Sequence, residues 1–305
     1  MFAFQENPLN RHGDIRHTPD FISKVIDQAQ TRFLPVFKQS IACTTQEDHK
    51  NPLWLSYDQL STSFGEVNDK HLIYLGELDS KHYFTYRLKS AQLIDNIQKS
   101  LTHTKAKLCN LRDLLHYIDT KQAHLCNVAV AMEHWHNSHQ YCGQCGSETY
   151  STQAGFVRTC ADSECQQLHF PRTDSAVICA ITYEDKLLLG RQKNWPEKRY
   201  SVIAGFVEPG ETLEQAVARE AYEETGLVLS TINYYQSQPW PFPQSLMVGF
   251  TAESATSDIK LRDQELEEAR WFSKNQINTA INNGSLVLPF EYSISRTLIN
   301  QWLTK

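Results

Sequence analysis

Three glutamates stand close together in this 305-residue chain, and their spacing suits metal chemistry. Glu220, Glu223 and Glu224 are related as i, i+3 and i+4, so a helix would project their carboxylates from one face. Like charges placed so closely repel one another unless cations lie between them. Mg²⁺ and Mn²⁺ prefer carboxylate and carbonyl oxygens and fill their remaining positions with water or phosphate oxygens. The trio therefore predicts a divalent-metal site that handles a phosphate-bearing molecule.

The glutamates belong to a longer pattern, which reads GFVEPGETLEQAVAREAYEETGL over residues 205–227. The segment fits G-x5-E-x7-R-E-U-x-E-E-x-G-U, with U an apolar residue, at every fixed position. Thr212 predicts a capping box at the start of a helix, and Gly226 predicts its end. Arg219 lies on this helix outside the trio and is placed to pair with Glu211. The pattern indicates a loop, a helix and a second loop that hold the carboxylates.

Four of the eight cysteines form two short pairs. Cys142 and Cys145 form C-x2-C, and Cys160 and Cys165 form C-x4-C. Two chain-local pairs of thiolates suit tetrahedral zinc, which would replace the core that this short polar segment lacks. Four protein ligands leave no position for a reacting water, so the zinc is predicted to be structural. Two disulfides are the alternative, and few basic residues nearby support a nucleic-acid-binding ribbon.

A stiff aromatic segment, SQPWPFPQS, covers residues 237–245. Its three prolines fix φ and favour extended neighbours, so Trp240 and Phe242 have little entropy to lose on binding. These rings suit a planar base, and the serines and glutamines around them supply hydrogen-bonding groups. A packed loop and a polyproline-type ligand are the alternatives.

Composition and charge narrow the class of protein. Apolar residues make up 41% and charged residues 21%, as in ordinary soluble globular proteins, and the net charge of −6 argues against long-range attraction of nucleic acid. We see neither a secretion signal nor an apolar run long enough for a membrane helix. We therefore expect a cytoplasmic protein with no membrane association. The cysteines outside the cluster, Cys43, Cys109, Cys126 and Cys179, are predicted to be thiols, the last one buried.

The length of the chain predicts two domains with a small insert between them. The first region, which carries no catalytic motif, mixes a helix after Asp20, extending as far as Phe33, with paired strands from His71 and His82 and a helix that contains Leu125 and Trp135. Strands, the carboxylate helix, more strands and a C-terminal helical pair follow Pro171. The predicted division is residues 1–138, an α+β domain; residues 139–170, a zinc ribbon; and residues 171–305, an α/β domain.

The glutamate pattern resembles the Nudix box of the Nudix hydrolases, which hydrolyse a nucleoside diphosphate linked to another group. SQPWPFPQS is similar to the signature SQPWPFPxS of the NADH pyrophosphatases, and the cysteine cluster matches that subfamily. The resemblance runs over residues 140–300. It implies a Nudix α/β/α sandwich with a mixed sheet, preceded by a zinc ribbon and an α+β N-terminal domain.

The resemblance also implies roles for individual residues. It assigns the catalytic metal to Glu220, Glu224, the Ala204 carbonyl and Glu265, with Glu267 and Glu268 as alternatives to Glu265. It gives Glu223 a part in metal or water handling. Our hypothesis is that Glu223 orients or deprotonates the attacking water, with Glu265 as the second candidate for that role. The substrate-binding residues it implies are Phe170, Phe206, Gln238, Pro239, Trp240, Pro241, Phe242, Pro243, Gln244, Ser245, Ser295 and Arg112.

The activity implied by the resemblance is metal-dependent hydrolysis of NADH or NAD to AMP and nicotinamide mononucleotide, with removal of NAD caps from RNA 5′ ends as an extension. The implied cofactors are catalytic Mg²⁺ or Mn²⁺ and one structural Zn²⁺ per chain, and the implied assembly is a homodimer. One alternative is a Nudix hydrolase of another nucleoside diphosphate derivative. A second alternative, a non-catalytic zinc-ribbon nucleotide sensor, has less support because every carboxylate of the box is present.

Overall fold

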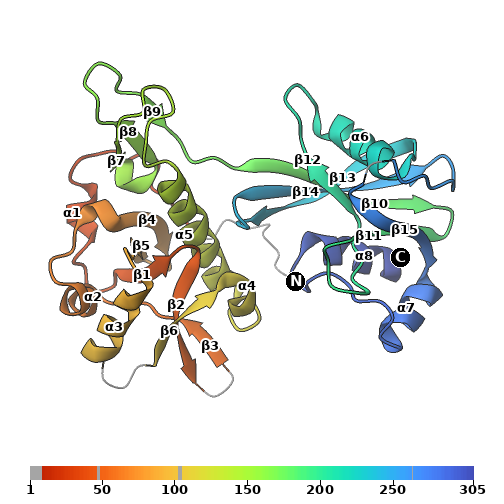
Figure 1. The fold of residues 1–305 in the computed structure, drawn as a ribbon. Helices are drawn as coiled ribbons and strands as arrows, with labels where there is room; N and C mark the ends of the chain where they lie inside the picture. Colours follow the sequence, from red (N-terminus) through yellow and green to blue (C-terminus); the bar gives the residue numbers. More distant parts are fainter. Residues whose placement is uncertain (1–8, 47–48, 102–104, 263) are drawn as a thin grey trace. The chain divides into compact units, whose positions relative to one another are not determined.

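The computed structural model describes residues 9–46, 49–101, 105–262 and 264–305, and the chain divides into two compact units (Figure 1). The C-terminal unit contains Thr173–Trp240 and Ser245–Lys305. The N-terminal unit contains the described residues from Leu9 to Arg172 together with Pro241–Gln244. The finer division at residues 138/139 and 170/171 stays a prediction.

The C-terminal unit is built on a mixed sheet whose order is β13-β14-β10-β11-β15, with β12 paired to β10. β10 runs parallel to β14, and the other pairs are antiparallel. Two strands share the edge of β10 that faces away from β14. β12 pairs with residues 176–179 of β10, and β11 pairs with residues 182–183. The strands are β10 (Asp174–Tyr183), β11 (Lys186–Gln192), β12 (Ile203–Phe206), β13 (Leu229–Trp240), β14 (Ser245–Ser254) and β15 (Leu266–Ser273).

Helices cover both faces of this sheet. Alternate residues of β10 point to opposite sides: Val177 and Cys179 pack with α6 (Leu213–Thr225), whereas Ile178 and Ala180 pack with α7 (Lys274–Asn282) and α8 (Ile294–Thr304). Two separate apolar cores result, one on each side of the strands. The predicted α/β/α sandwich with a mixed sheet is confirmed.

The N-terminal unit contains a second mixed sheet, of order β3-β2-β1-β5-β4, with β6 paired to β2 and with β1 parallel to β5. The predicted α+β class, the paired strands β4 and β5, and the long helix α5 before the cysteines are confirmed. The strands are β1 (Arg32–Phe37), β2 (Ser40–Gln46), β3 (His49–Pro52), β4 (Leu72–Leu78), β5 (Lys81–Arg87) and β6 (Ala106–Asn110), and the helices are α1 (Phe21–Val25), α2 (Tyr57–Phe64), α3 (Ile94–Ser100), α4 (Leu111–Leu114) and α5 (Thr120–Ser138).

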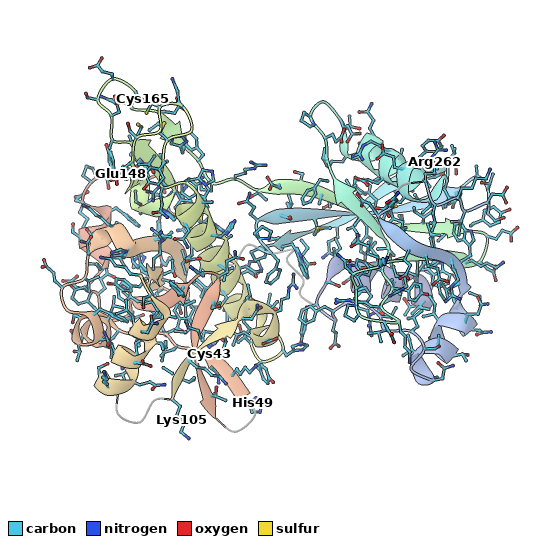
Figure 2. All side chains as sticks on the ribbon, in the orientation of Figure 1. Cys43, His49, Lys105, Glu148, Cys165 and Arg262 are labelled. Atoms are coloured by element: carbon cyan, nitrogen blue, oxygen red, sulfur yellow. A yellow bond between two sulfur atoms is a disulfide. The ribbon has the colours of Figure 1, made fainter. Side chains whose placement is uncertain are left out.

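Two local predictions for this unit are wrong. The helix after Asp20 ends at Val25 without a side-chain cap from Asp20, and Phe33 belongs to β1 instead. Cys43 and Cys109 are joined by a disulfide with a Cα–Cα distance of 6.2 Å (Cys43 is labelled in Figure 2). The two residues are diagonal neighbours on β2 and β6, a pairing over 66 residues that spacing alone does not reveal. Cys126 and Cys179 are buried thiols, as expected.

The cysteine segment forms a small three-stranded sheet of β7 (Thr149–Thr152), β8 (Val157–Cys160) and β9 (Leu168–His169). Arg158 of β8 is 6% exposed and donates hydrogen bonds to the carbonyls of His139 and Thr149. This buried guanidinium offers no basic surface to a nucleic acid. Among the residues placed by the structure, no helix is both long and apolar enough to cross a membrane.

Candidate active site

Helix α6 begins and ends where the sequence predicts. The Thr212 hydroxyl accepts a hydrogen bond from the Gln215 N–H at 3.2 Å, and the Gln215 side chain accepts one from the Thr212 N–H at 2.8 Å, which completes a capping box. Gly226 adopts the left-handed conformation, with φ of 71°, and its N–H bonds to the Tyr222 carbonyl. Ala221 anchors the inner face of the helix in the core. The opposite face is thereby fixed for the glutamates.

Arg219 organises the carboxylates around it. Its Nε and Nη2 donate to the two oxygens of Glu211 at 2.6 and 3.0 Å, which confirms the predicted pair. Its Nη1 also donates to Glu220 and Glu223, both at 2.9 Å, and Nη2 reaches the Phe206 carbonyl at 2.8 Å. Spacing along the chain does not reveal these last contacts. Hydrogen bonds to Glu211 are the main reason that the pKa of Arg219 is raised and that the pKa of Glu211 is lowered.

Glu220 is the enclosed member of the trio. Its side chain is 12% exposed and lies against Gly205 of β12, where a Cβ atom would overlap the carboxylate. Burial raises the pKa of Glu220, Arg219 opposes this shift, and the nearby charges of Glu223 and Glu265 add to it. Glu224 is also buried, whereas half of the Glu223 side chain is exposed. One carboxylate therefore faces the strand and another faces solvent.

The structure separates the three candidates for the downstream ligand. Glu267 pairs with Arg191, and Glu268 accepts a hydrogen bond from Tyr200 at 2.5 Å and forms an ion pair with Arg270. The charge of Glu265, in contrast, acts on Glu220. These interactions favour Glu265 as the residue that shares a site with the glutamates of α6.

The donor set fits a hard divalent cation. The Glu220 carboxylate of α6 approaches the backbone of β12 at Gly205, the residue that follows Ala204, and the absent side chain is what permits this approach. Carboxylate and carbonyl oxygens are the ligands that Mg²⁺ and Mn²⁺ prefer. The residues that could hold such an ion are Glu220, Glu224, Glu265 and the carbonyl of Ala204.

The aromatic segment forms the end of a β-hairpin and not a separate loop. Ser237–Trp240 belong to β13, Ser245 starts β14, and Trp240 pairs with Ser245 in register. Gln238 is 6% exposed: its Nε2 donates to the Tyr292 carbonyl and its Oε1 accepts the Ile294 N–H, both at 2.7 Å. Both polar atoms of this amide thus hold α8 against the hairpin.

The remaining predicted substrate residues lie in both units. Phe206, 58% exposed, belongs to the C-terminal unit, where Ser295 is buried and its hydroxyl lies 2.7 Å from that of Ser201. Within the N-terminal unit, Phe170 is 63% exposed and the Arg112 guanidinium lies 4.3 Å from the centre of the Phe242 ring. The structure therefore brings Glu211, Glu220 and Glu223 together at Arg219. It also places the Arg112 guanidinium against the Phe242 ring.

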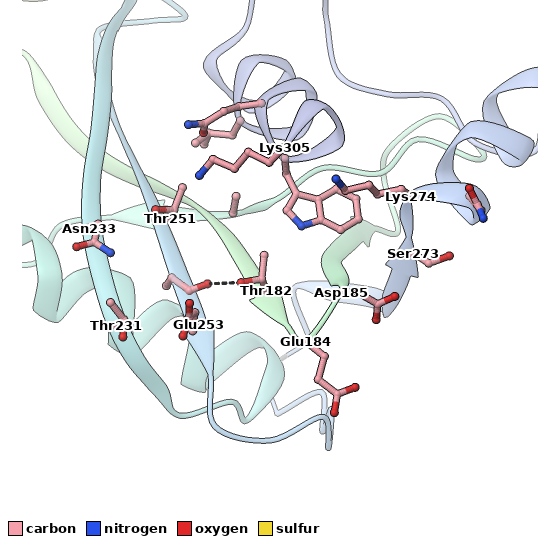
Figure 3. A pocket seen from close by; sticks show the side chains of 16 residues that line it. Thr182, Glu184, Asp185, Thr231, Asn233, Thr251, Glu253, Ser273, Lys274 and Lys305 are labelled. Carbon is pink, nitrogen blue, oxygen red and sulfur yellow. Dashed lines mark hydrogen bonds between the residues drawn. The ribbon is translucent and has the colours of Figure 1, made fainter.

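A cavity of about 690 Å³ lies elsewhere in the C-terminal unit (Figure 3). Thr182, Asn233 and Lys305 line it, from β10, β13 and the C-terminus, and no residue of the glutamate pattern does. Its size does not make it the centre of the chemistry, because the charged groups suited to a diphosphate and its cations are in the carboxylate cluster.

The four clustered cysteines bring their sulfurs together (Cys165 is labelled in Figure 2). Cys142 and Cys165 are 3.8 Å apart at Sγ, and Cys145 and Cys160 are 3.4 Å apart. Sulfurs bonded to one tetrahedral zinc at about 2.3 Å stand roughly 3.8 Å from each other. The distances suit one shared ion and are too long for the alternative of two disulfides, whose S–S bonds are about 2.05 Å.

Comparison with known proteins places both units. Residues 172–288 match the family model "NUDIX domain", and residues 30–135 match "NADH pyrophosphatase-like rudimentary NUDIX domain". The second match was not anticipated, because the N-terminal sheet carries no glutamate pattern to mark it. A solved structure, a NUDIX hydrolase from Nitrosomonas europaea, has a TM-score of 0.44 and 22% identity over 54% of this chain and 90% of its own.

Two relatives define the family. The chain is 33% identical to NAD-capped RNA hydrolase NUDT12 of Homo sapiens, over 78% of this chain and 55% of that protein. It is 30% identical to an NAD-capped RNA hydrolase of Schizosaccharomyces pombe, over 97% of this chain and 91% of the relative. The chain spans about half the length of several curated relatives, the human protein among them. By these matches, the chain belongs to the NADH pyrophosphatase-like Nudix hydrolases.

Proposed function

We propose that this chain hydrolyses the diphosphate bond of NADH or NAD, giving AMP and nicotinamide mononucleotide, and that it removes NAD caps from RNA 5′ ends. The observation that carries the proposal is the Glu220 carboxylate, which lies on Gly205 and is joined through Arg219 to Glu211 and Glu223. The names of the two relatives above support the substrate class. The net charge of −6 makes local neutralisation of an anionic substrate necessary.

Each acidic residue has a distinct place in the proposed reaction. Glu220, Glu224, Glu265 and the Ala204 carbonyl would hold Mg²⁺ or Mn²⁺, and the ion would supply neutralisation of the diphosphate and a more acidic bound water. Glu223 accepts the proton of the attacking water. Arg219 holds the Oε2 atom of Glu223 by a hydrogen bond. The Glu223 side chain is half exposed, which suits contact with water and substrate. Arg219 of α6 also bonds Glu211 and so holds the loop before the helix in place.

Substrate binding is assigned to aromatic surfaces and to the hairpin end. Phe206 presents an exposed ring at the end of β12, two residues after Ala204. Its carbonyl accepts a hydrogen bond from Arg219, which also bonds the carboxylates. Trp240, Phe242 and Phe170 are proposed to contact the dinucleotide through their rings. Gln244 and Ser245 are proposed to contact it through their polar groups. Gln238 acts by positioning the hairpin, because its amide is bonded to the start of α8.

The test is Glu223→Gln, with NADH and Mg²⁺, measured as release of AMP. Loss of a general base should lower kcat by about 100- to 10,000-fold, while the Kd for NADH, measured in the presence of Ca²⁺, stays near that of the wild type. Glu214→Gln, an exposed glutamate in the first turn of the same helix, is the matched control and should be fully active. Retained turnover in Glu223→Gln would remove the residue from this role.

Substrate choice needs a separate measurement. NADH, NAD, NAD-capped RNA and a sugar nucleotide are compared by kcat/KM, and ¹⁸O-labelled water identifies the phosphorus that is attacked. Tight binding of dinucleotides without hydrolysis of any of them would favour the sensor instead. The homodimer and the cytoplasmic location stay predictions, the first to be measured by light scattering.

A further inference from the structure

A third group of metal-type ligands lies in the N-terminal unit, outside both the carboxylate cluster and the four cysteines. His12, Glu77 and His82 each offer one ligand atom, and these atoms all lie within 4.8 Å of one another. All three side chains are partly buried, so the group is not an exposed acidic surface. The group has no part in the proposed hydrolysis.

The fold brings these residues together through a hairpin and a crossing segment. Glu77 and His82 are paired across β4 and β5, so their side chains share one face of the sheet. The strand register shifts between Tyr74 and Gly76, and such a bulge re-aims the side chains beside it. The backbone of Gly76 adopts a φ of +145°, as glycine readily does.

The segment that carries His12 is fixed to this hairpin by backbone bonds. Asn10 and Glu77 exchange two hydrogen bonds of 3.0 and 2.7 Å. A Cβ atom at Gly76 would lie 3.1 Å from the Asn10 carbonyl, so the glycine allows the close approach. The Asn10 side chain also accepts the His12 N–H at 3.0 Å. The position of the imidazole therefore follows from the sheet and not from a freely moving loop.

The ring nitrogens are arranged as in a metal site with outer-sphere support. His12 Nε2 lies 2.6 Å from Glu77 Oε2, and His82 Nδ1 lies 2.9 Å from the Tyr74 hydroxyl. Metal-binding histidines commonly use one ring nitrogen for the ion and the other for such a hydrogen bond. Tyr74 therefore leaves Nε2 of His82 as the ligand atom.

We propose that His12, Glu77 and His82 bind a second zinc-type divalent ion, which pins the segment around His12 to the β4–β5 hairpin. Two imidazoles and one carboxylate suit zinc and disfavour Mg²⁺, which prefers oxygen ligands. Ligands of a tetrahedral zinc stand about 3.4 Å apart. The ion therefore replaces the proton between His12 and Glu77, and these two atoms separate by less than about 1 Å. Water completes the coordination.

The test counts zinc ions in the full-length protein. Wild type, His82→Gln, Glu77→Gln and the control His71→Gln are dialysed against micromolar Zn²⁺, washed and measured by mass spectrometry of the metal. His71 is a partly buried histidine of the same unit that lies outside the ligand group. We expect two zinc ions per chain in wild type and in His71→Gln, and one in each of the other variants.

Cobalt substitution gives an internal control for folding. Co²⁺ bound to the four cysteines has an intense thiolate charge-transfer band, which should be equal in all four proteins if the unit is folded. The proposed site should add weaker visible absorption in wild type and His71→Gln alone. One zinc per chain in wild type, or two in His82→Gln with the thiolate band intact, would overturn the proposal and leave His12 and Glu77 as an ion pair. Neither result bears on NADH hydrolysis.

Discussion

Gly205 offers a direct test of how the carboxylate cluster works. This residue of β12 pairs with Val177 of β10, and its lack of a side chain lets the Glu220 carboxylate lie against the strand. In Gly205→Ala the new methyl group would overlap all three terminal atoms of Glu220. The carboxyl carbon would lie 1.9 Å from the methyl group. Because non-bonded carbon atoms settle about 3.5 to 4.0 Å apart, the carboxylate must retreat by roughly 2 Å.

That displacement sets the size of the expected effect. Misplacing a group that positions the reaction by about 1 Å costs about 100-fold in rate, which corresponds to about 2.7 kcal/mol of transition-state free energy. We therefore expect kcat/KM for NADH to fall by at least about 100-fold and the Mg²⁺ concentration for half-maximal activity to rise. The assay is AMP release at a series of Mg²⁺ concentrations. Thermal unfolding of the same samples reports whether the variant is folded.

Two further variants isolate the cause. Gly13→Ala places its methyl group where nothing lies within 4 Å, so its activity should match wild type. In Gly205→Ala with Glu220→Asp, the shorter acid has room beside the methyl group, and activity should recover in part relative to Gly205→Ala alone. Unchanged activity and Mg²⁺ dependence in Gly205→Ala would refute the reasoning, because Glu220 would then not need its place on β12.

Two other predictions concern stability. Thr212→Ala removes the N-cap of α6 and should lower the free energy of unfolding by about 1 kcal/mol, seen in urea as a lower midpoint with an unchanged slope. The raised pKa of Glu220 means that its contribution to stability is full below the ordinary glutamate pKa of 4.5 and is lost as pH rises through the folded value. In EDTA, Glu220→Gln should therefore weaken this fall in stability with pH, and Mg²⁺ should stabilise wild type more than the variant above that pH. Equal pH profiles would contradict the second prediction.

Features set by neighbours along the chain were predictable. The capping box of α6, its glycine end and the Arg219–Glu211 pair all follow from spacings of eight residues or fewer, where helix geometry fixes the distances. The convergence of Cys142 and Cys145 with the second cysteine pair follows in the same way, since each pair is held by one short turn.

Features that depend on which strands meet were not predictable from one sequence. The disulfide of Cys43 depends on β6 pairing with β2, and the hydrogen bonds of Gln238 depend on where α8 docks. Helical periodicity after Asp20 was misleading because Phe33 fills the core from a strand. The second Nudix-type sheet lacks the glutamate pattern, so neither its residue types nor their spacing distinguish it from any other α+β domain.

Arg219 explains how this cluster of acids can persist before a cation arrives. One guanidinium bonds Glu211, Glu220 and Glu223 at once, so the repulsion among the acids is offset within the folded chain. Its bonds to Glu211 use both oxygens of that acid, whereas each of the other two is engaged through a single oxygen. A bound cation can therefore take up Glu220 without releasing Glu211. The loop would stay anchored to the helix while a cation replaced the guanidinium as the partner of Glu220.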